Sequence, residues 1–333
     1  MVASSAQKFR VTWMLLGLLV VSALLSALLL TIADRQMGLM RAEQYVGRKF
    51  PYNGRFYLHY IRFKPENGKT TFRFLDYLSV MSAVNNLKPD RIIVHGDMIP
   101  TGVYWIAALA TRIVEHRFRN ATRTVGHRFG ETKEIGFKEH SADISKLDVL
   151  LEFGGVVADF DVFFIRGERI KKILTQRRSI VCYGDEDGYN IGLIAGWPDS
   201  KLLYAWRRSY EDIYVNDWNF NQAFVAKYLS ILYQKENYVL GMACNNPHPY
   251  DLESFFHEYG RIHWQDSAAI HTYERFGKIP EVTSPSLLYE GNLTTHNEML
   301  QWIYEGRPLP SVNTTFRDEM DPLTDKLNDM TII

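Results

Sequence analysis

The sequence predicts an α/β fold, with a mostly parallel central sheet flanked by helices and preceded by a single transmembrane helix. Two observations predict it. From Phe56 onward, short runs of β-branched and aromatic residues alternate with longer stretches that have the apolar spacing of helices. Ahead of this part, residues 11–33 contain no charged side chain. The composition, 46% apolar and 23% charged, is otherwise that of an ordinary globular domain.

Residues 11–33 are long enough to cross a bilayer as a helix, because a helix rises ~1.5 Å per residue and the hydrocarbon core is about 30 Å thick. A cleaved signal peptide is the alternative, but its apolar region is shorter, roughly 7–15 residues. We therefore expect a transmembrane signal anchor at residues 11–33. Residues 1–10 would then form a cytosolic tail and residues 34–50 a short stem.

Orientation in the membrane is predicted from glycosylation sequons, because basic residues are about equally frequent on both sides of the apolar segment. Asn120, Asn292 and Asn313 each begin an Asn-x-Thr acceptor sequence, which is used only in the secretory lumen. They favour a type II glycoprotein with a lumenal main domain. The two cysteines, Cys182 and Cys244, could pair there, but the sequence leaves this open.

Within the lumenal part, a globular domain is expected at residues 51–280 and a loosely structured C-terminal tail, rich in Pro, Asn, Thr and acidic residues, at 281–333. β-branched and aromatic runs predict strands, and apolar residues at helical spacing predict helices. The expected strands are 56–63, 91–96, 155–160, 179–183 and 190–195. The expected helices are 72–87, 103–116, 140–153, 168–175, 199–210 and 219–232.

The segment 139–164 carries the clearest chemical signal. Its predicted helix ends at Gly154 and Gly155, because glycine readily adopts the left-handed conformation that follows a helix. The strand that comes next runs directly into Asp159 and Asp161.

Two aspartates two positions apart in an extended chain point to the same side. At the carboxyl end of a strand they lie where open α/β sheets bind ligands. Carboxylate oxygens there suit Mn²⁺ or Mg²⁺, which commonly also bind phosphate oxygens of a substrate. The pattern is therefore consistent with metal-assisted departure of a diphosphate. A second Asp-x-Asp, Asp185 to Asp187, precedes Gly188 and is expected to form an acidic turn.

Residues 140–164, HSADISKLDVLLEFGGVVADFDVFF, resemble the DXD-containing sugar-binding segment of glycosyltransferase family 32. A weaker resemblance extends from residue 56 to about Tyr273. Members of that family are retaining, metal-dependent GT-A enzymes, among them α-1,4-galactosyltransferases and α-1,6-mannosyltransferases. The resemblance implies a GT-A fold and a nucleotide-sugar donor, most plausibly UDP-linked. It also implies a hydroxyl acceptor on a glycan or glycolipid.

The resemblance also implies roles for individual residues. Asp159 and Asp161 match the pair that binds the cation and the donor diphosphate. Asp143 matches the aspartate that contacts the donor sugar, and Lys146 stands where the family usually has arginine. With Asp161, these two residues are the expected catalytic set. His271 resembles the late histidine that completes the metal shell.

Two further positions are expected near the substrates. Asn190 resembles the asparagine on the strand that approaches the acceptor. Tyr57 or His59, two apart and so on one side of the first strand, is a candidate for stacking on the nucleotide base, and packing in the core is the favoured alternative for most of this run. Two positions depart from the family pattern. Lys146 keeps the positive charge but lacks the bidentate fork of arginine, and Val157 replaces a common tyrosine. The donor sugar, and activity itself, are left open by these changes.

Other classes of function fit less well. The net charge is zero, from 38 basic and 38 acidic residues, which argues against a nucleic-acid-binding protein, because neutralisation of phosphates needs a basic excess. Haloacid-dehalogenase phosphatases also use Asp-x-Asp, but they place it on the first strand and need Thr or Val where this chain has Phe163. A non-catalytic, membrane-tethered sugar-binding protein of the same fold is the remaining alternative. Residence in the Golgi membrane is expected by family analogy.

Overall fold

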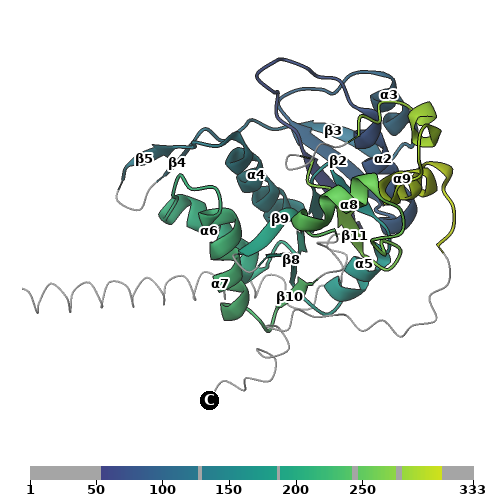
Figure 1. The fold of residues 1–333 in the computed structure, drawn as a ribbon. Coiled ribbons are helices and arrows are strands. Elements are labelled where there is room, and N and C mark those ends of the chain that lie inside the picture. Colours follow the sequence, from purple (N-terminus) through teal and green to yellow (C-terminus); the bar gives the residue numbers. More distant parts are fainter. Residues whose placement is uncertain (1–53, 127–129, 186–187, 242–246, 275–279, 310–333) are drawn as a thin grey trace, which may run out of the picture. The chain divides into compact units, whose positions relative to one another are not determined.

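The computed structural model describes residues 54–126, 130–185, 188–241, 247–274 and 280–309, which belong to one compact unit (Figure 1). The expected tail, membrane anchor and stem, residues 1–50, lie outside the described residues. Within the described part of the chain, no helix is long and apolar enough to cross a membrane.

A seven-stranded sheet forms the centre of the domain, in the order β10–β8–β9–β6–β1–β2–β3. β9 runs antiparallel to both of its neighbours, and every other neighbouring pair is parallel. This arrangement confirms the predicted α/β class with a mostly parallel sheet. The strands are β1 (Tyr57–Ile61), β2 (Arg91–Gly96), β3 (Val114–Phe118), β6 (Gly155–Ala158), β8 (Ser179–Asp185), β9 (Gly188–Gly196) and β10 (Asn237–Leu240).

Helices cover both faces of this sheet (Figure 1). The helices are α2 (Phe74–Ser82), α3 (Val103–Ala110), α4 (Lys138–Phe153), α5 (Glu168–Leu174), α6 (Lys201–Asp212), α7 (Val225–Leu232), α8 (Leu252–His257) and α9 (Thr295–Glu305). Short π or 3₁₀ segments occupy Ala83–Leu87, Phe220–Phe224, Pro249–Asp251 and Pro285–Tyr289.

A hydrophobic core lies on each face of the central sheet, and successive side chains of β6 point into one core and then the other. Val156 packs into the core shared with α2, α3 and α5, whereas Val157 packs into the core shared with α4, α6 and α7. Successive strand residues point to opposite faces, so a strand covered on both faces is apolar at every position. This explains why the segment before Asp159 reads as an uninterrupted apolar run.

Two small antiparallel sheets complete the domain. β7 (Val162–Phe164) pairs with β11 (Ala269–His271), and β4 (Thr124–Gly126) pairs with β5 (Thr132–Glu134). A third core lies between the first pair, α8 and α9, and it includes Phe163, Ile270 and Met299.

Two expectations differ from the structure. The helix expected at 103–116 ends at Ala110, and residues 114–118 form the edge strand β3. Arg112 has a φ of 63°, which a right-handed helix cannot contain, so the chain turns there. The tail expected after residue 280 includes α9, which starts at the N-cap Thr294 and buries Met299, Leu300 and Ile303. The other expected elements are confirmed within a few residues.

Candidate metal and donor site

Asp159 and Asp161 flank the turn that connects β6 to β7. The Asp159 N–H donates to the Gly192 carbonyl of β9 at 2.8 Å, and the Val162 N–H donates to the Asp159 carbonyl at 3.1 Å. The two aspartates therefore lie at the carboxyl end of a central strand, the position at which α/β sheets bind ligands.

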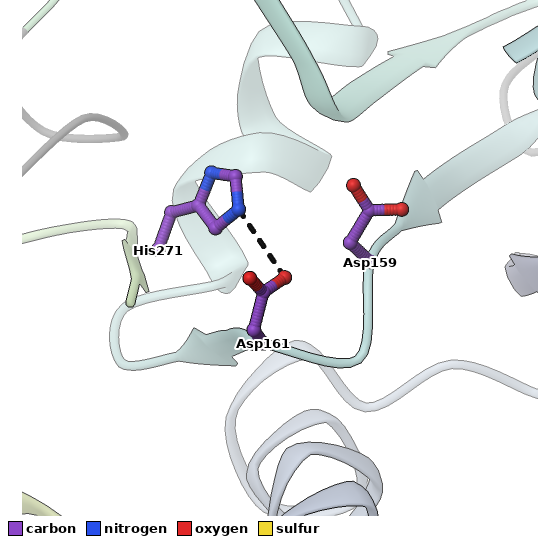
Figure 2. Close-up of side chains that lie close together, drawn as sticks. All are labelled: Asp159, Asp161 and His271. Carbon is purple, nitrogen blue, oxygen red and sulfur yellow. Dashed lines mark ion pairs between the residues drawn. The ribbon is translucent and has the colours of Figure 1, made fainter. Parts of the chain in front are cut away.

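His271 joins them from a distant part of the sequence. It ends β11, and the antiparallel register places it opposite Val162. Its Nε2 lies 3.2 Å from Asp161 Oδ1 (Figure 2). The backbone that follows adds hydrogen bonds to the same aspartate, from the Thr272 N–H to the carbonyl at 2.9 Å and from the Glu274 N–H to Oδ2 at 3.0 Å.

The three side chains form a group that fits a divalent cation. One ligand atom from each of Asp159, Asp161 and His271 lies within 4.8 Å of the others (Figure 2). Carboxylate and imidazole donors together suit Mn²⁺, and carboxylates also suit Mg²⁺. Burial raises the pKa of the Asp161 carboxyl, but His271 and the Glu274 N–H outweigh this and hold the pKa at about 2. Asp161 is therefore ionised at neutral pH.

Lys146 and Asp143, both on α4, form the adjoining wall. The Lys146 Nζ lies 2.8 Å from Asp159 Oδ1 and 3.3 Å from Asp143 Oδ1, with its side chain only 4% exposed. Burial lowers the pKa of Lys146, but Asp159 and Asp143 raise it further, so the ammonium stays charged. The second oxygen of Asp143 is buried without a hydrogen-bond partner in the described part of the chain. Such an atom is costly unless a ligand or water bonds to it.

Asn190 lies beside the histidine. Its Nδ2 is 2.9 Å from His271 Nδ1 and donates to the Tyr273 hydroxyl at 2.6 Å. Its Oδ1 accepts from the Gly192 N–H at 2.6 Å. The structure thus brings Asn190 to the candidate metal group, while its expected contact with an acceptor stays a prediction.

Tyr57 and His59 are not brought to this site. Tyr57 begins β1, four residues before the end that adjoins Asp159, and its ring packs against His59 and Phe153. Four strand residues span roughly 13 Å. His59 is buried and hydrogen-bonded to His95 and to the Gly154 carbonyl, each at 3.0 Å.

Of two residues that sequence reasoning missed, one lies between the aspartates and the other packs on its ring. Phe160, between Asp159 and Asp161, stacks on Tyr60 at 4.3 Å, and the Arg62 guanidinium lies 5.6 Å from the Phe160 ring centre. The sequence feature that could have identified Phe160 is its position inside the Asp-x-Asp motif. The feature that could have identified Arg62 is its position just after the first strand.

The remaining predicted residues fall into two groups. Asn120 and Asn292 are exposed in loops, whereas Asn313 lies outside the described residues. Cys182 is buried on β8 and disulfide-bonded, and Cys244 lies outside the described residues.

Comparison with known proteins gives a distant curated relative. No protein-family model matches the chain. Glucan organizing enzyme 1 of Cryptococcus neoformans is 26% identical over 167 residues, which cover 46% of this chain and 43% of that protein. The chain thus matches less than half the length of this relative.

Solved structures of similar arrangement include two glycosyltransferases. The apo form of GlyE from Streptococcus pneumoniae TIGR4 is 13% identical, covers 82% of this chain and 62% of its own, and has a TM-score of 0.43. The galactosyltransferase LgtC, solved with donor and acceptor sugar analogues, is 14% identical, covers 77% and 97%, and has a TM-score of 0.38. Likenesses this distant assign neither a family nor an activity to the chain.

Proposed function

We propose that the protein is a GT-A glycosyltransferase of the family 32 type. It would transfer a sugar from a nucleotide-sugar donor, most plausibly UDP-linked, to a hydroxyl of a glycan or glycolipid. The observation that carries this proposal is the convergence of Asp159, Asp161 and His271 at the carboxyl end of β6, with Lys146 bound to Asp159 from α4. The name of the curated relative, which refers to glucan, supports a glycan acceptor.

Each residue of the site would have a distinct role. Asp159, Asp161 and His271 would hold Mn²⁺ or Mg²⁺, which neutralises the negative charge that develops on a departing diphosphate. Lys146 fixes the position of Asp159 and adds a positive charge on the same side. The free oxygen of Asp143 would accept a hydrogen bond from a hydroxyl of the donor sugar, which satisfies a buried acceptor.

We propose retention of configuration at the transferred carbon, as the family resemblance implies. The measurement is the anomeric form of the product by NMR immediately after transfer. An α-linked product from an α-linked donor is expected, and a β-linked product would exclude retention.

We also propose a lumenal domain in the Golgi membrane, anchored through residues 11–33. Exposed sequons at Asn120 and Asn292 support this location, and so does a disulfide at Cys182, because disulfides persist in oxidising compartments. In eukaryotic cells, removal of N-glycans should increase the electrophoretic mobility of the wild type. A mobility identical before and after glycosidase treatment would contradict the lumenal location.

The activity is tested on the full-length protein in detergent with UDP-Gal, UDP-GlcNAc, UDP-Glc and GDP-Man. Release of nucleoside diphosphate from one donor is expected with Mn²⁺, and its loss is expected with chelator or in Asp161→Asn. Asp251→Asn, an exposed aspartate on another segment, is the matched control and should stay active. Release that survives both chelator and Asp161→Asn would overturn the proposal. Metal-dependent donor binding without any turnover would favour the non-catalytic alternative.

A further inference from the structure

The helix α3 lies at the periphery of the domain beside β3 and presents an apolar face to solvent (Figure 1). Its sequence, VYWIAALA, contains no charged side chain. Val103 and Ile106 are 72% and 67% exposed, Ala110 is also exposed, and Ile99 in the loop before the helix is 64% exposed. We call these four residues the α3 face. A helix that is apolar all round is normally covered, so this face indicates an interaction surface.

Phe118 adds a large apolar side chain on the same side of the sheet. Val114, at the start of the edge strand β3, packs into the core beneath α3. Alternate residues of a strand point to one side, so Phe118 points to the side that carries α3. It is 68% exposed. Exposed apolar side chains therefore come from both the helix and the edge strand next to it.

Basic side chains flank the α3 face. Arg112, directly after the helix, is exposed. Lys69 is exposed in a loop that pairs with the residues just before the helix. The carboxylate of Asp97, in the loop that leads to α3, accepts the Lys64 N–H at 2.6 Å. An apolar surface with cationic groups at its two ends suits a lipid bilayer, whose phosphates lie outside its apolar core.

The path of the chain brings a bilayer within reach of this surface. Strands β1, β2 and β3 are parallel, so all three begin at one edge of the sheet. Because α3 leads into β3, the helix ends at the edge where β1 begins. The segment 34–56, which connects the proposed membrane anchor to β1, spans at most roughly 80 Å even if fully extended. The anchor would therefore hold the α3 side of the domain close to the membrane.

We propose that the α3 face and Phe118 lie on the surface of the lipid bilayer that holds the anchor. The apolar side chains enter the boundary between headgroups and acyl chains, and Lys69 and Arg112 lie near the lipid phosphates. Helices at this boundary bury their apolar side about 5–10 Å deep. This inference rests on the proposed membrane anchor at residues 11–33. A second copy of the chain is the alternative occupant of the face, and the test separates the two.

The test uses the full-length protein in vesicles of phosphatidylcholine and phosphatidylserine. Ile106→Cys, Leu232→Cys and Ser22→Cys each carry one fluorophore, and the wild type gives the background labelling. Phospholipids with nitroxides on their acyl chains quench a fluorophore that contacts the bilayer. Ile106→Cys should lose most of its fluorescence. Leu232 is the matched control, because it is apolar and 74% exposed on α7, on the opposite side of the sheet, and its label should stay bright.

Each result decides the matter. An unquenched label in Ile106→Cys, with quenching in Ser22→Cys, would overturn the inference and leave the anchor in place. Equal quenching in Ile106→Cys and Leu232→Cys would also overturn it, because lipid contact would not be confined to the α3 side. Cross-linking of Ile106→Cys into dimers by a bismaleimide, without quenching, would assign the face to a second copy.

Ser22→Cys reports on the proposed anchor itself, because Ser22 lies in the middle of residues 11–33. An unquenched label there would remove the anchor together with the inference. Release of nucleoside diphosphate from a donor is measured separately and does not depend on this result. Thermal unfolding of each variant by circular dichroism checks that it is folded.

Discussion

Lys146 shows at the level of one residue how the site is held together. Its ammonium is buried between Asp143 and Asp159, and burial of an unpaired charge is strongly unfavourable. The pairing explains why a lysine can occupy a helix face that is otherwise packed against the sheet. It also links the helix α4 directly to Asp159 of the candidate metal group.

Replacing this lysine should destabilise the protein. Lys146→Met leaves Asp143 buried without its cation, so the free energy of unfolding should fall by about 3 kcal/mol. Lys146→Arg keeps the charge, so its free energy of unfolding should fall much less. Urea unfolding of the purified variants measures both. Equal stability of Lys146→Met and wild type would show that the ion pairs of Lys146 do not contribute to the free energy of unfolding.

Because His296 is buried, we expect the protein to lose stability in acid. It packs edge-on against Phe255 and Phe256, and its Nδ1 has no partner in the described part of the chain. Burial lowers its pKa from 6.5 to about 3. Below pH 6.5 the unfolded histidine binds a proton that the folded one does not, so stability falls as the pH falls from 6.5 to about 3.

This residue alone should cost about 2 kcal/mol between pH 7 and pH 5. His296→Phe removes the titrating group, so its unfolding free energy should fall less over this interval. Urea unfolding of both proteins at the two pH values gives the difference. A parallel decline in wild type and His296→Phe would contradict the assignment.

At the level of elements, the junction of α4 and β6 positions Asp159. Gly154 and Gly155 have φ angles of 69° and 105°, which only glycine adopts without strain. A Cβ on Gly155 would also collide with the Tyr57 carbonyl of the neighbouring strand β1. The two glycines therefore end the helix and let β6 pair closely with β1.

Gly155→Ala should be much more harmful than a glycine replacement at an open position. Gly260 has a φ of 73° with no atom within 4 Å of an added Cβ, so Gly260→Ala bears only the conformational cost, about 1–2 kcal/mol. Gly155→Ala adds the backbone collision and should lose considerably more unfolding free energy. Thermal unfolding of both variants is the measurement. Similar losses would show that the close approach of β1 is unimportant.

For the whole molecule, local patterns predicted most elements but not their assembly. The strand before Asp159 is apolar because both of its faces are covered, and this is visible in the sequence. The order of the seven strands is not visible in the sequence, because it depends on pairing between distant segments. The apolar run at 103–116 also reads as one helix until the turn at Arg112 is known.

The site was predictable to a similar degree. Asp159 and Asp161 follow from their place after a strand. The pairing of β7 with β11 brings His271 beside them, and only the family resemblance pointed to it. The contact between Asn190 and His271 depends on the same long-range pairing. The register of β1 with β6, which the sequence does not show, places Tyr57 four residues before the end of β1 that adjoins Asp159, and its contact with a nucleotide base stays a prediction.

The central claim is that Asp159, Asp161 and His271 form a metal centre that binds the diphosphate of a donor. Calorimetric titration of UDP and GDP into the full-length protein tests it most directly, with Mn²⁺ and with chelator, in wild type and Asp161→Ala. One nucleotide should bind to the wild type with Mn²⁺, and binding should be lost with chelator and in the variant. Equal nucleotide affinity with and without the metal, or in wild type and Asp161→Ala, would contradict the claim.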